Sequence, residues 1–226
     1  MKILVIRNDK LGDFVQALPA FAMLKASNPK LKLTALVPAY TAPLAQICPY
    51  LDSVIIDSVK NDKADFNRLV KEIKEQKFDG MISFFSNTHN GKLAWKSGIP
   101  YRLAPATKWV QILYNHRLTQ RRSRSEKSEA EYNQDLARAF LKKHNMPIVD
   151  PKPPYLSLPE SAVKKQRVFL QEQFGLSADK KWVFVHSGTG GSATSLSLTQ
   201  YAQLIQGLLN EFDSQIILTE IGRAHV

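Results

Sequence analysis

Apolar runs and helix-like periodicities alternate along the N-terminal part of this chain. The apolar runs predict strands at residues 2–6, 31–37, 54–56 and 81–85. Apolar positions at helical spacing predict helices at residues 13–27, 41–48 and 66–73. Strands separated by helices imply right-handed crossovers and a parallel, doubly wound sheet. The pattern therefore predicts a Rossmann-like α/β domain for residues 1–155.

The alternation starts again after a proline-rich stretch at residues 146–159, whose stiffness and polarity are typical of an interdomain connection. Beyond this stretch, the pattern predicts in chain order a helix at 161–174, a strand at 181–186, a helix from Ser197 and a strand at 215–218. Ser197 and Gln200 have the spacing of a capping box. Residues 156–220 are therefore predicted to begin a second Rossmann-like domain.

A polar turn follows the first predicted strand and ends in Gly12 and Asp13. Ligands of open α/β sheets bind outside the carboxyl ends of the strands, which is where this turn lies. An aspartate carboxylate is ionised at neutral pH and can accept a proton, so Asp13 is the candidate catalytic base and Asp9 is a weaker one. Because Gln16 follows at capping-box spacing, Asp13 is also suited to be the N-cap of the first helix.

A glycine-rich loop follows the strand predicted at 181–186 and precedes the helix that starts near Ser197. Glycine backbone N–H groups, hydroxyl donors and a helix N-terminus together favour a phosphate. A tight turn without a ligand would also explain the loop. The candidate phosphate-binding residues are Ser187, Gly188, Thr189, Gly190, Gly191, Ser192 and Thr194.

Charge favours anionic partners, because 31 basic residues face 20 acidic ones and the formal net charge is +11. From Tyr101 onward the chain is expected to form a basic loop with interleaved aromatic residues, followed by a helix at residues 129–143. The loop is either an anion-binding surface or a solvated segment. An apolar face there, formed by Trp109, Ile112 and Leu113, suits a bilayer surface or burial in a cleft. A basic nucleic-acid-binding module is the alternative function.

Several features limit the other functional classes. The single cysteine, Cys48, has apolar neighbours typical of a core position and excludes a disulfide within the chain. Charged residues from Arg7 to Asp13 interrupt the apolar run that a signal peptide needs, so we expect a cytoplasmic protein. We expect no cofactor and no metal, because no metal-ligand spacing is found among the scattered histidines His89, His116 and His144.

Three segments carry a family resemblance: residues 3–21, residues 78–102, and the Val185-His186-Ser187-Gly188 loop. Together they resemble glycosyltransferase family 9, the lipopolysaccharide heptosyltransferases. The resemblance implies a two-domain GT-B fold, with residues 1–155 on the acceptor side and 156–220 on the donor side. It also implies inverting, metal-independent transfer of heptose from a nucleotide-sugar donor, ADP-heptose, to the lipid A core, with Asp13 at the position of the family's catalytic aspartate.

On this basis the acceptor-binding residues are predicted to be Asn8, Lys10, Arg117, Arg121 and Arg122. We expect a monomer that binds no nucleic acid and that associates peripherally with the inner face of the cytoplasmic membrane. Two departures from the family stand out. Thr194 occupies a position where the family often has a basic residue. Residues 220–226 resemble a translated sequencing adapter, so 221–226 are expected to be a non-native tail and the chain an inactive part of an active transferase.

Overall fold

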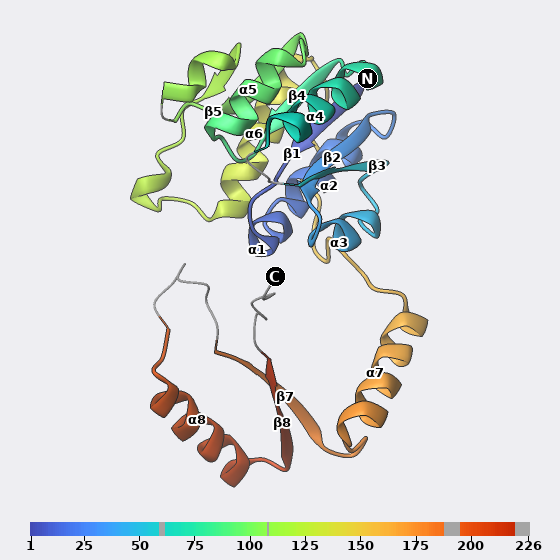
Figure 1. Cartoon of the computed structure of the whole chain (residues 1–226), viewed down its shortest axis with the longest axis vertical. Coiled ribbons are helices and arrows are strands. Elements are labelled where there is room, and N and C mark those ends of the chain that lie inside the picture. The colour runs from blue at the N-terminus through green and yellow to red at the C-terminus, as the bar shows by residue number, and fades with distance from the viewer. Residues whose placement is uncertain (59–61, 108, 188–194, 220–226) are drawn as a thin grey trace. The chain divides into compact units, whose positions relative to one another are not determined.

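The structure is a computed structural model that describes residues 1–58, 62–107, 109–187 and 195–219. The chain forms two compact units, Met1–Ser157 and Leu158–Val226 (Figure 1). Among the described residues, no helix is long and apolar enough to cross a membrane.

The first unit is built on one sheet of six parallel strands with the order β3-β2-β1-β4-β5-β6. Its strands are β1 (Lys2–Ile6), β2 (Lys32–Pro38), β3 (Ser53–Asp57), β4 (Gly80–Ser83), β5 (Tyr101–Pro105) and β6 (His116–Leu118). Strand β1 lies centrally between β2 and β4, with Ile6 opposite both Leu36 and Ser83. The predicted parallel, doubly wound α/β class is confirmed.

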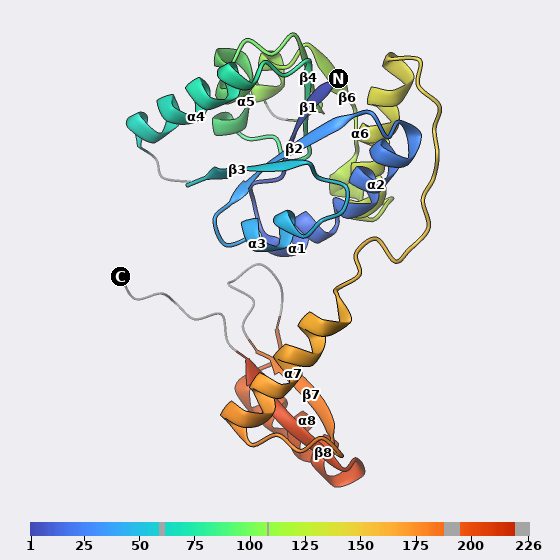
Figure 2. The same cartoon turned by 90° about the vertical axis from the view of Figure 1, so that its right-hand side faces the viewer.

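Helices cover both faces of this sheet (Figure 2). They are α1 (Leu11–Val15), α2 (Leu18–Ser27), α3 (Ala42–Gln46), α4 (Lys63–Gln76), α5 (Thr88–Lys96) and α6 (Glu129–Lys143). Alternate side chains of β1 enter two cores, because successive residues of a strand point to opposite faces. Ile3 and Val5 pack with α2 and α6, whereas Leu4 and Ile6 pack on the face that α4 and α5 cover.

The helix predicted at residues 13–27 is in fact two helices, α1 and α2. They are separated at Gln16 and Ala17, and Pro19 lies in the first turn of α2. Proline has no backbone N–H to donate to the preceding turn, so it begins a helix more readily than it continues one. The break makes α1 a short helix that carries Asp13 by itself.

The basic loop predicted from Tyr101 onward is also partly wrong, because β5 and β6 extend the sheet there. Two short 3₁₀ helices accompany them, η1 (Trp109–Leu113) and η2 (Arg122–Arg124). Leu103 and Ala104 are buried in β5, but the surrounding arginines hide the short apolar pattern in the sequence. In η1, Val110 is buried while Trp109 and Ile112 are exposed.

The second unit contains two helices and two parallel strands, α7 (Glu160–Phe174), β7 (Lys181–His186), α8 (Leu198–Glu211) and β8 (Ser214–Thr219). The predicted capping box of α8 is present, since Ser197 and Gln200 exchange backbone and side-chain hydrogen bonds. The elements predicted at 161–174, 181–186 and 215–218 are present in the described residues, and their membership of a second Rossmann-like domain stays a prediction.

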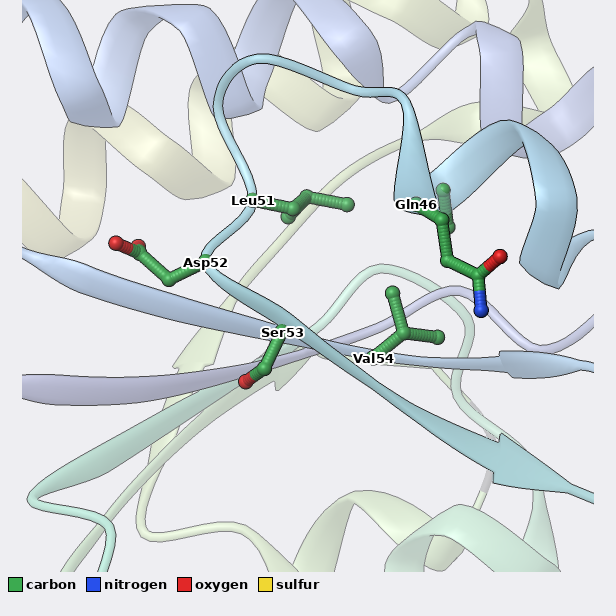
Figure 3. Close-up of a pocket in the computed structure, with 6 residues that line it drawn as sticks. Gln46, Leu51, Asp52, Ser53 and Val54 are labelled. Atoms are coloured by element: carbon green, nitrogen blue, oxygen red, sulfur yellow. The ribbon is translucent and has the colours of Figure 1, made fainter.

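At the amino end of β3, Asp52 joins two strands and a helix. Its carboxylate accepts hydrogen bonds from Lys25 Nζ at 2.6 Å, Lys32 Nζ at 3.0 Å and the Leu33 N–H at 2.8 Å. Burial opposes ionisation, but these donors outweigh it and lower the pKa of Asp52 to about 2. A small pocket of about 180 Å³ is lined by Asp52 together with Gln46, Leu51 and Val54 (Figure 3). It lies at the edge of the sheet opposite to Asp13.

We predict that Asp52→Asn lowers the free energy of unfolding by about 1–2 kcal/mol at pH 7. This is less than the full pKa shift would give, because the carboxylate is partly exposed and solvent screens its ion pairs. Folding lowers this pKa, so the stabilisation is present above about pH 4 and is lost as the pH falls toward 2. Urea unfolding of both proteins between pH 7 and pH 2 should show the difference shrinking. Asp150→Asn, which removes an exposed partner of Arg138, is the control and should leave stability unchanged.

Candidate active site

The carboxyl end of β1 leads directly into a short polar turn. Arg7, Asn8 and Asp9 follow the strand, and Lys10 is the N-cap residue of α1. Asp13 is the third residue of α1, and no side chain caps this helix. The alternative that Asp13 is the N-cap is therefore wrong. Instead its carboxylate, with 37% of the side chain exposed, forms an ion pair with Arg7.

Arg7 gathers three carboxylates around one buried guanidinium group. Its Nε lies 3.0 Å from Asp9 Oδ1, its Nη2 lies 2.9 Å from Asp13 Oδ1, and its Nη1 donates to Glu129 Oε1 at 3.0 Å. Glu129 also accepts from Arg122 Nη1 at 2.6 Å. We call these five residues the Arg7 cluster. A buried cation is tolerated only when it is paired, which explains why several acids converge on it.

The guanidinium of Arg7 is fixed by neutral groups as well. Only 3% of the side chain is exposed, and Nη1 donates to the carbonyl oxygen of Phe84 at 3.0 Å. Asn133 Oδ1 lies 3.5 Å from the same nitrogen. Because the guanidinium is a rigid plane with diverging donors, these contacts fix the direction in which it faces Asp13.

Asp9 is the carboxylate of the cluster whose titration is most altered. Burial raises its pKa to about 6; the Arg7 charge opposes this, and the charges of Asp13 and Glu129 add to it. The Tyr40 hydroxyl donates to the Asp9 carbonyl oxygen and closes the turn from the side. Two guanidinium groups thus face three carboxylates, of which Asp9 is set to take up a proton near neutral pH.

Asn8 is buried in a second network at the same edge of the sheet. Its amide nitrogen donates to Asp57 Oδ2 at 2.6 Å and to Asn90 Oδ1 at 2.8 Å, and Asn90 returns a hydrogen bond to its oxygen. His89 Nε2 lies 3.1 Å from the same Asp57 oxygen. These bonds join the ends of β1 and β3 to α5. They give Asn8 a structural role, and its predicted contact with an acceptor stays a prediction.

The other residues predicted to bind the acceptor lie at different distances from Asp13. Lys10 is exposed at the start of α1, in the same turn as Asp9. Arg122 is committed to Glu129 and Gln120, and its guanidinium stacks over the Tyr132 ring at 5.4 Å. Exposed Arg121 lines a small pocket of about 280 Å³ together with Lys127 and Tyr132.

Arg117 is exposed on β6, the outermost strand of the sheet. The structure therefore brings Lys10 and Arg122 next to the Asp13 site and leaves Arg117 at the sheet edge.

The predicted donor loop lies mostly outside the described residues, including Gly188, Thr189, Gly190, Gly191, Ser192 and Thr194. Ser187 is described and exposed, directly after β7. After the loop, the Ser195 hydroxyl contacts Tyr201 Oη at 3.0 Å. Before the loop, at the end of β7, His186 Nδ1 contacts Thr219 Oγ1 at 2.9 Å. Donor binding by this loop stays a prediction.

Within residues 1–58, 62–107, 109–187 and 195–219, no group of His, Cys, Asp and Glu side chains is arranged to hold a metal ion. Cys48 is a free, buried thiol, as its apolar neighbours predicted. Burial raises its pKa, which disfavours the thiolate that a nucleophile needs.

Sequence reasoning missed the two residues that organise the site, Arg7 and Glu129. Arg7 was visible only as a charge that interrupts an apolar run, and Glu129 only as the first residue of a helix. A charged residue immediately after a central buried strand is a usable signal, because its side chain starts inside the fold and must find partners there.

No protein-family model matches this chain. A protein of Haemophilus influenzae that carries the name of a glycosyltransferase is 82% identical over 218 residues. The match covers 96% of this chain and 63% of that protein, so the chain spans less than two thirds of the relative's length.

Solved structures share the fold at low sequence identity. E. coli ADP-heptose lps heptosyltransferase II superimposes with a TM-score of 0.76 at 21% identity, covering 96% of this chain and 64% of that one. A glycosyl transferase family 9 protein from Veillonella parvula gives 0.75 at 14%, covering 97% and 68%. E. coli heptosyltransferase WaaC, solved with ADP-2-deoxy-2-fluoro heptose, gives 0.71 at 17%, covering 100% and 70%. The chain is thus similar in sequence to the Haemophilus glycosyltransferase over most of its own length, and it shares the fold of the heptosyltransferase structures.

Proposed function

We propose that this chain carries the acceptor side of an inverting glycosyltransferase and the beginning of its donor side. The transferred sugar is a heptose from ADP-heptose, and the acceptor is the inner core of lipopolysaccharide. The proposal rests on one observation above all: a partly exposed aspartate, Asp13, stands at the carboxyl edge of a parallel sheet with one oxygen held by a buried arginine.

In the proposed reaction, Asp13 takes the proton of an acceptor hydroxyl. The hydroxyl oxygen forms a bond to the anomeric carbon of the heptose from the face opposite the diphosphate. The bond between that carbon and the diphosphate oxygen breaks, and its electron pair leaves with ADP. A positioned base of this kind typically contributes about 10²–10⁴-fold to the rate. Attack from the opposite face inverts the anomeric centre.

The donor is supported by the relatives. The E. coli structures named above are heptosyltransferases, and one was solved with an ADP-heptose analogue. In this chain, Ser187 and the glycine-rich residues after it follow a strand and precede a capped helix, an order that suits a diphosphate. The reaction as proposed needs no metal ion, because fixed N–H dipoles of such a loop can stabilise the departing phosphate.

The acceptor would approach from a membrane. Exposed Trp109 and Ile112 project from η1, and the net charge of +11 favours an anionic surface. We include peripheral attachment to the cytoplasmic face of the inner membrane and a monomeric state in the proposal. The nucleic-acid-binding alternative gains no support from the site, since the basic groups Arg7 and Arg122 are engaged by carboxylates.

We predict that Asp13→Asn lowers kcat by about 10²–10⁴-fold and changes KM little, because only the proton transfer in the transition state is lost. ADP release from ADP-heptose with a Kdo-bearing lipid A acceptor measures this, in the 226-residue chain and in the longer Haemophilus relative. Asp65→Asn is the matched control: Asp65 is also a first-turn aspartate paired with an arginine, Arg68, but belongs to α4. Turnover by Asp13→Asn above half of the unmodified rate would contradict the proposed base.

The free energy of unfolding depends on pH because the Arg7 cluster contains Asp9, whose pKa is raised by folding. Folding raises its pKa from 3.8 to about 6, so the folded state binds the proton more tightly than the unfolded chain. The free energy of unfolding therefore falls as the pH rises from about 4 to about 6 and stays lower above that range. Holding Asp9 ionised at neutral pH costs stability.

We predict that Asp9→Asn removes this dependence. Between pH 4.5 and pH 7, the stability of the unmodified protein relative to this variant should fall by about 2 kcal/mol, because the shift of about two pH units is worth about 3 kcal/mol in total and part of it is expressed below pH 4.5. Urea unfolding monitored by circular dichroism measures it. The difference between the unmodified protein and Asp52→Asn should stay constant in that range, because Asp52 titrates below it and both proteins keep Asp9. Parallel curves for the unmodified protein and Asp9→Asn would contradict the prediction.

A further inference from the structure

Helix α6 contacts both Arg7, which is the ion-pair partner of Asp13, and α1, which is the helix that carries Asp13. Glu129 and Asn133 lie one turn apart on the same face of α6. Glu129 accepts a hydrogen bond from Arg7 Nη1, while Asn133 Nδ2 donates to the carbonyl oxygen of Gln16 at 3.0 Å. Gln16 is the C-cap residue of α1. The start of α6 is thus tied to Asp13 by two separate routes.

The geometry of the guanidinium makes the Glu129 contact directional. Nη1 is held by Glu129 and by the Phe84 carbonyl oxygen, and Nη2, in the same rigid plane, faces Asp13 at 2.9 Å. Fixing one end of the plane fixes the other. With only 3% of the Arg7 side chain exposed, little water is present to replace a missing partner.

Glu129 is itself firmly placed. Ser128 and Glu131 form a capping box that fixes the start of α6. Arg122 donates to the same Glu129 oxygen at 2.6 Å, and Arg122 is anchored in turn by Gln120 and the Tyr132 ring. The carboxylate therefore presents a defined oxygen to Arg7.

We infer that Glu129 is a positioning residue for the base: acting through Arg7, it sets the orientation of the Asp13 carboxylate toward the acceptor hydroxyl. This inference rests on the proposed function of Asp13. Glu129 does not touch the reacting atoms, so its removal should affect the transition state through misplacement. A displacement of about 1 Å can cost about 10²-fold in rate.

The test compares Glu129→Gln with Glu131→Gln. Both variants remove one acidic charge from the first turn of α6, so their effects on the helix dipole are matched. Glutamine at position 131 can keep the capping-box hydrogen bond to Ser128, and only Glu129 contacts Arg7. We expect Glu129→Gln to lower kcat by about tenfold or more with KM for donor and acceptor within about twofold, and Glu131→Gln to leave kcat unchanged. Arg7→Lys, which replaces the planar fork by a point charge, should reproduce the kcat loss.

A second readout does not require turnover. In the unliganded protein, nitrogen-15 NMR of the arginine side chains measures the exchange protection of the Arg7 guanidinium protons. We expect protection to drop at least about tenfold in Glu129→Gln and to persist in Glu131→Gln, because only the first variant weakens an acceptor of Nη1. Thermal unfolding of each variant shows whether the fold is retained.

The outcomes separate the two ideas. If Asp13→Asn is inactive while Glu129→Gln keeps the kcat of Glu131→Gln, the positioning role is wrong and the proposed base stands. If Asp13→Asn keeps its turnover, the proposed function fails and the positioning role with it. If no form of the protein turns over ADP-heptose, the NMR comparison decides, and unchanged Arg7 protection in Glu129→Gln overturns the inference.

Discussion

The candidate site depends on a single buried cation. Arg7 leaves the end of the central strand β1 with almost no exposed surface, and a guanidinium in that position must be surrounded by acceptors. Asp9 and Asp13 come from the next few residues, whereas Glu129 comes from a helix 122 residues further along the chain. The requirement to pair one charge therefore joins the first turn of the protein to α6. It also brings Asp13 to the edge of the sheet in a fixed orientation.

The sheet supplies the conditions for this arrangement. Both faces of β1 are covered, so a residue directly after the strand is still inside the protein. The two edges of the sheet use aspartate in opposite ways. At the amino edge, Asp52 has three donors and a pKa lowered to about 2, whereas at the carboxyl edge burial raises the pKa of Asp9 to about 6. The first arrangement stabilises the fold, and the second is typical of a functional site, where ionisation is held near neutrality.

The positive charge of the chain also takes on a more specific meaning in the structure. An excess of basic residues suggested contact with anions throughout the region after Tyr101. Arg122, which lies in that region, instead forms an ion pair with Glu129 inside the protein, and so does Arg7 from the end of β1. The exposed ones, such as Arg121 and Arg117, face solvent. Net charge thus indicates the kind of partner, but the pairing within the fold decides which groups can meet it.

The sequence by itself determined the parallel α/β class, the position of Asp13 at the carboxyl edge of the sheet, and the boundaries of α6 and β7, because each depends on local periodicity and capping. Only the tertiary structure decided that Pro19 separates α1 from α2, that β5 and β6 extend the sheet, and that Asn8 is buried. It alone showed Arg7 and Glu129 as partners. Contacts between residues so far apart in the chain arise from packing, and no periodicity records them.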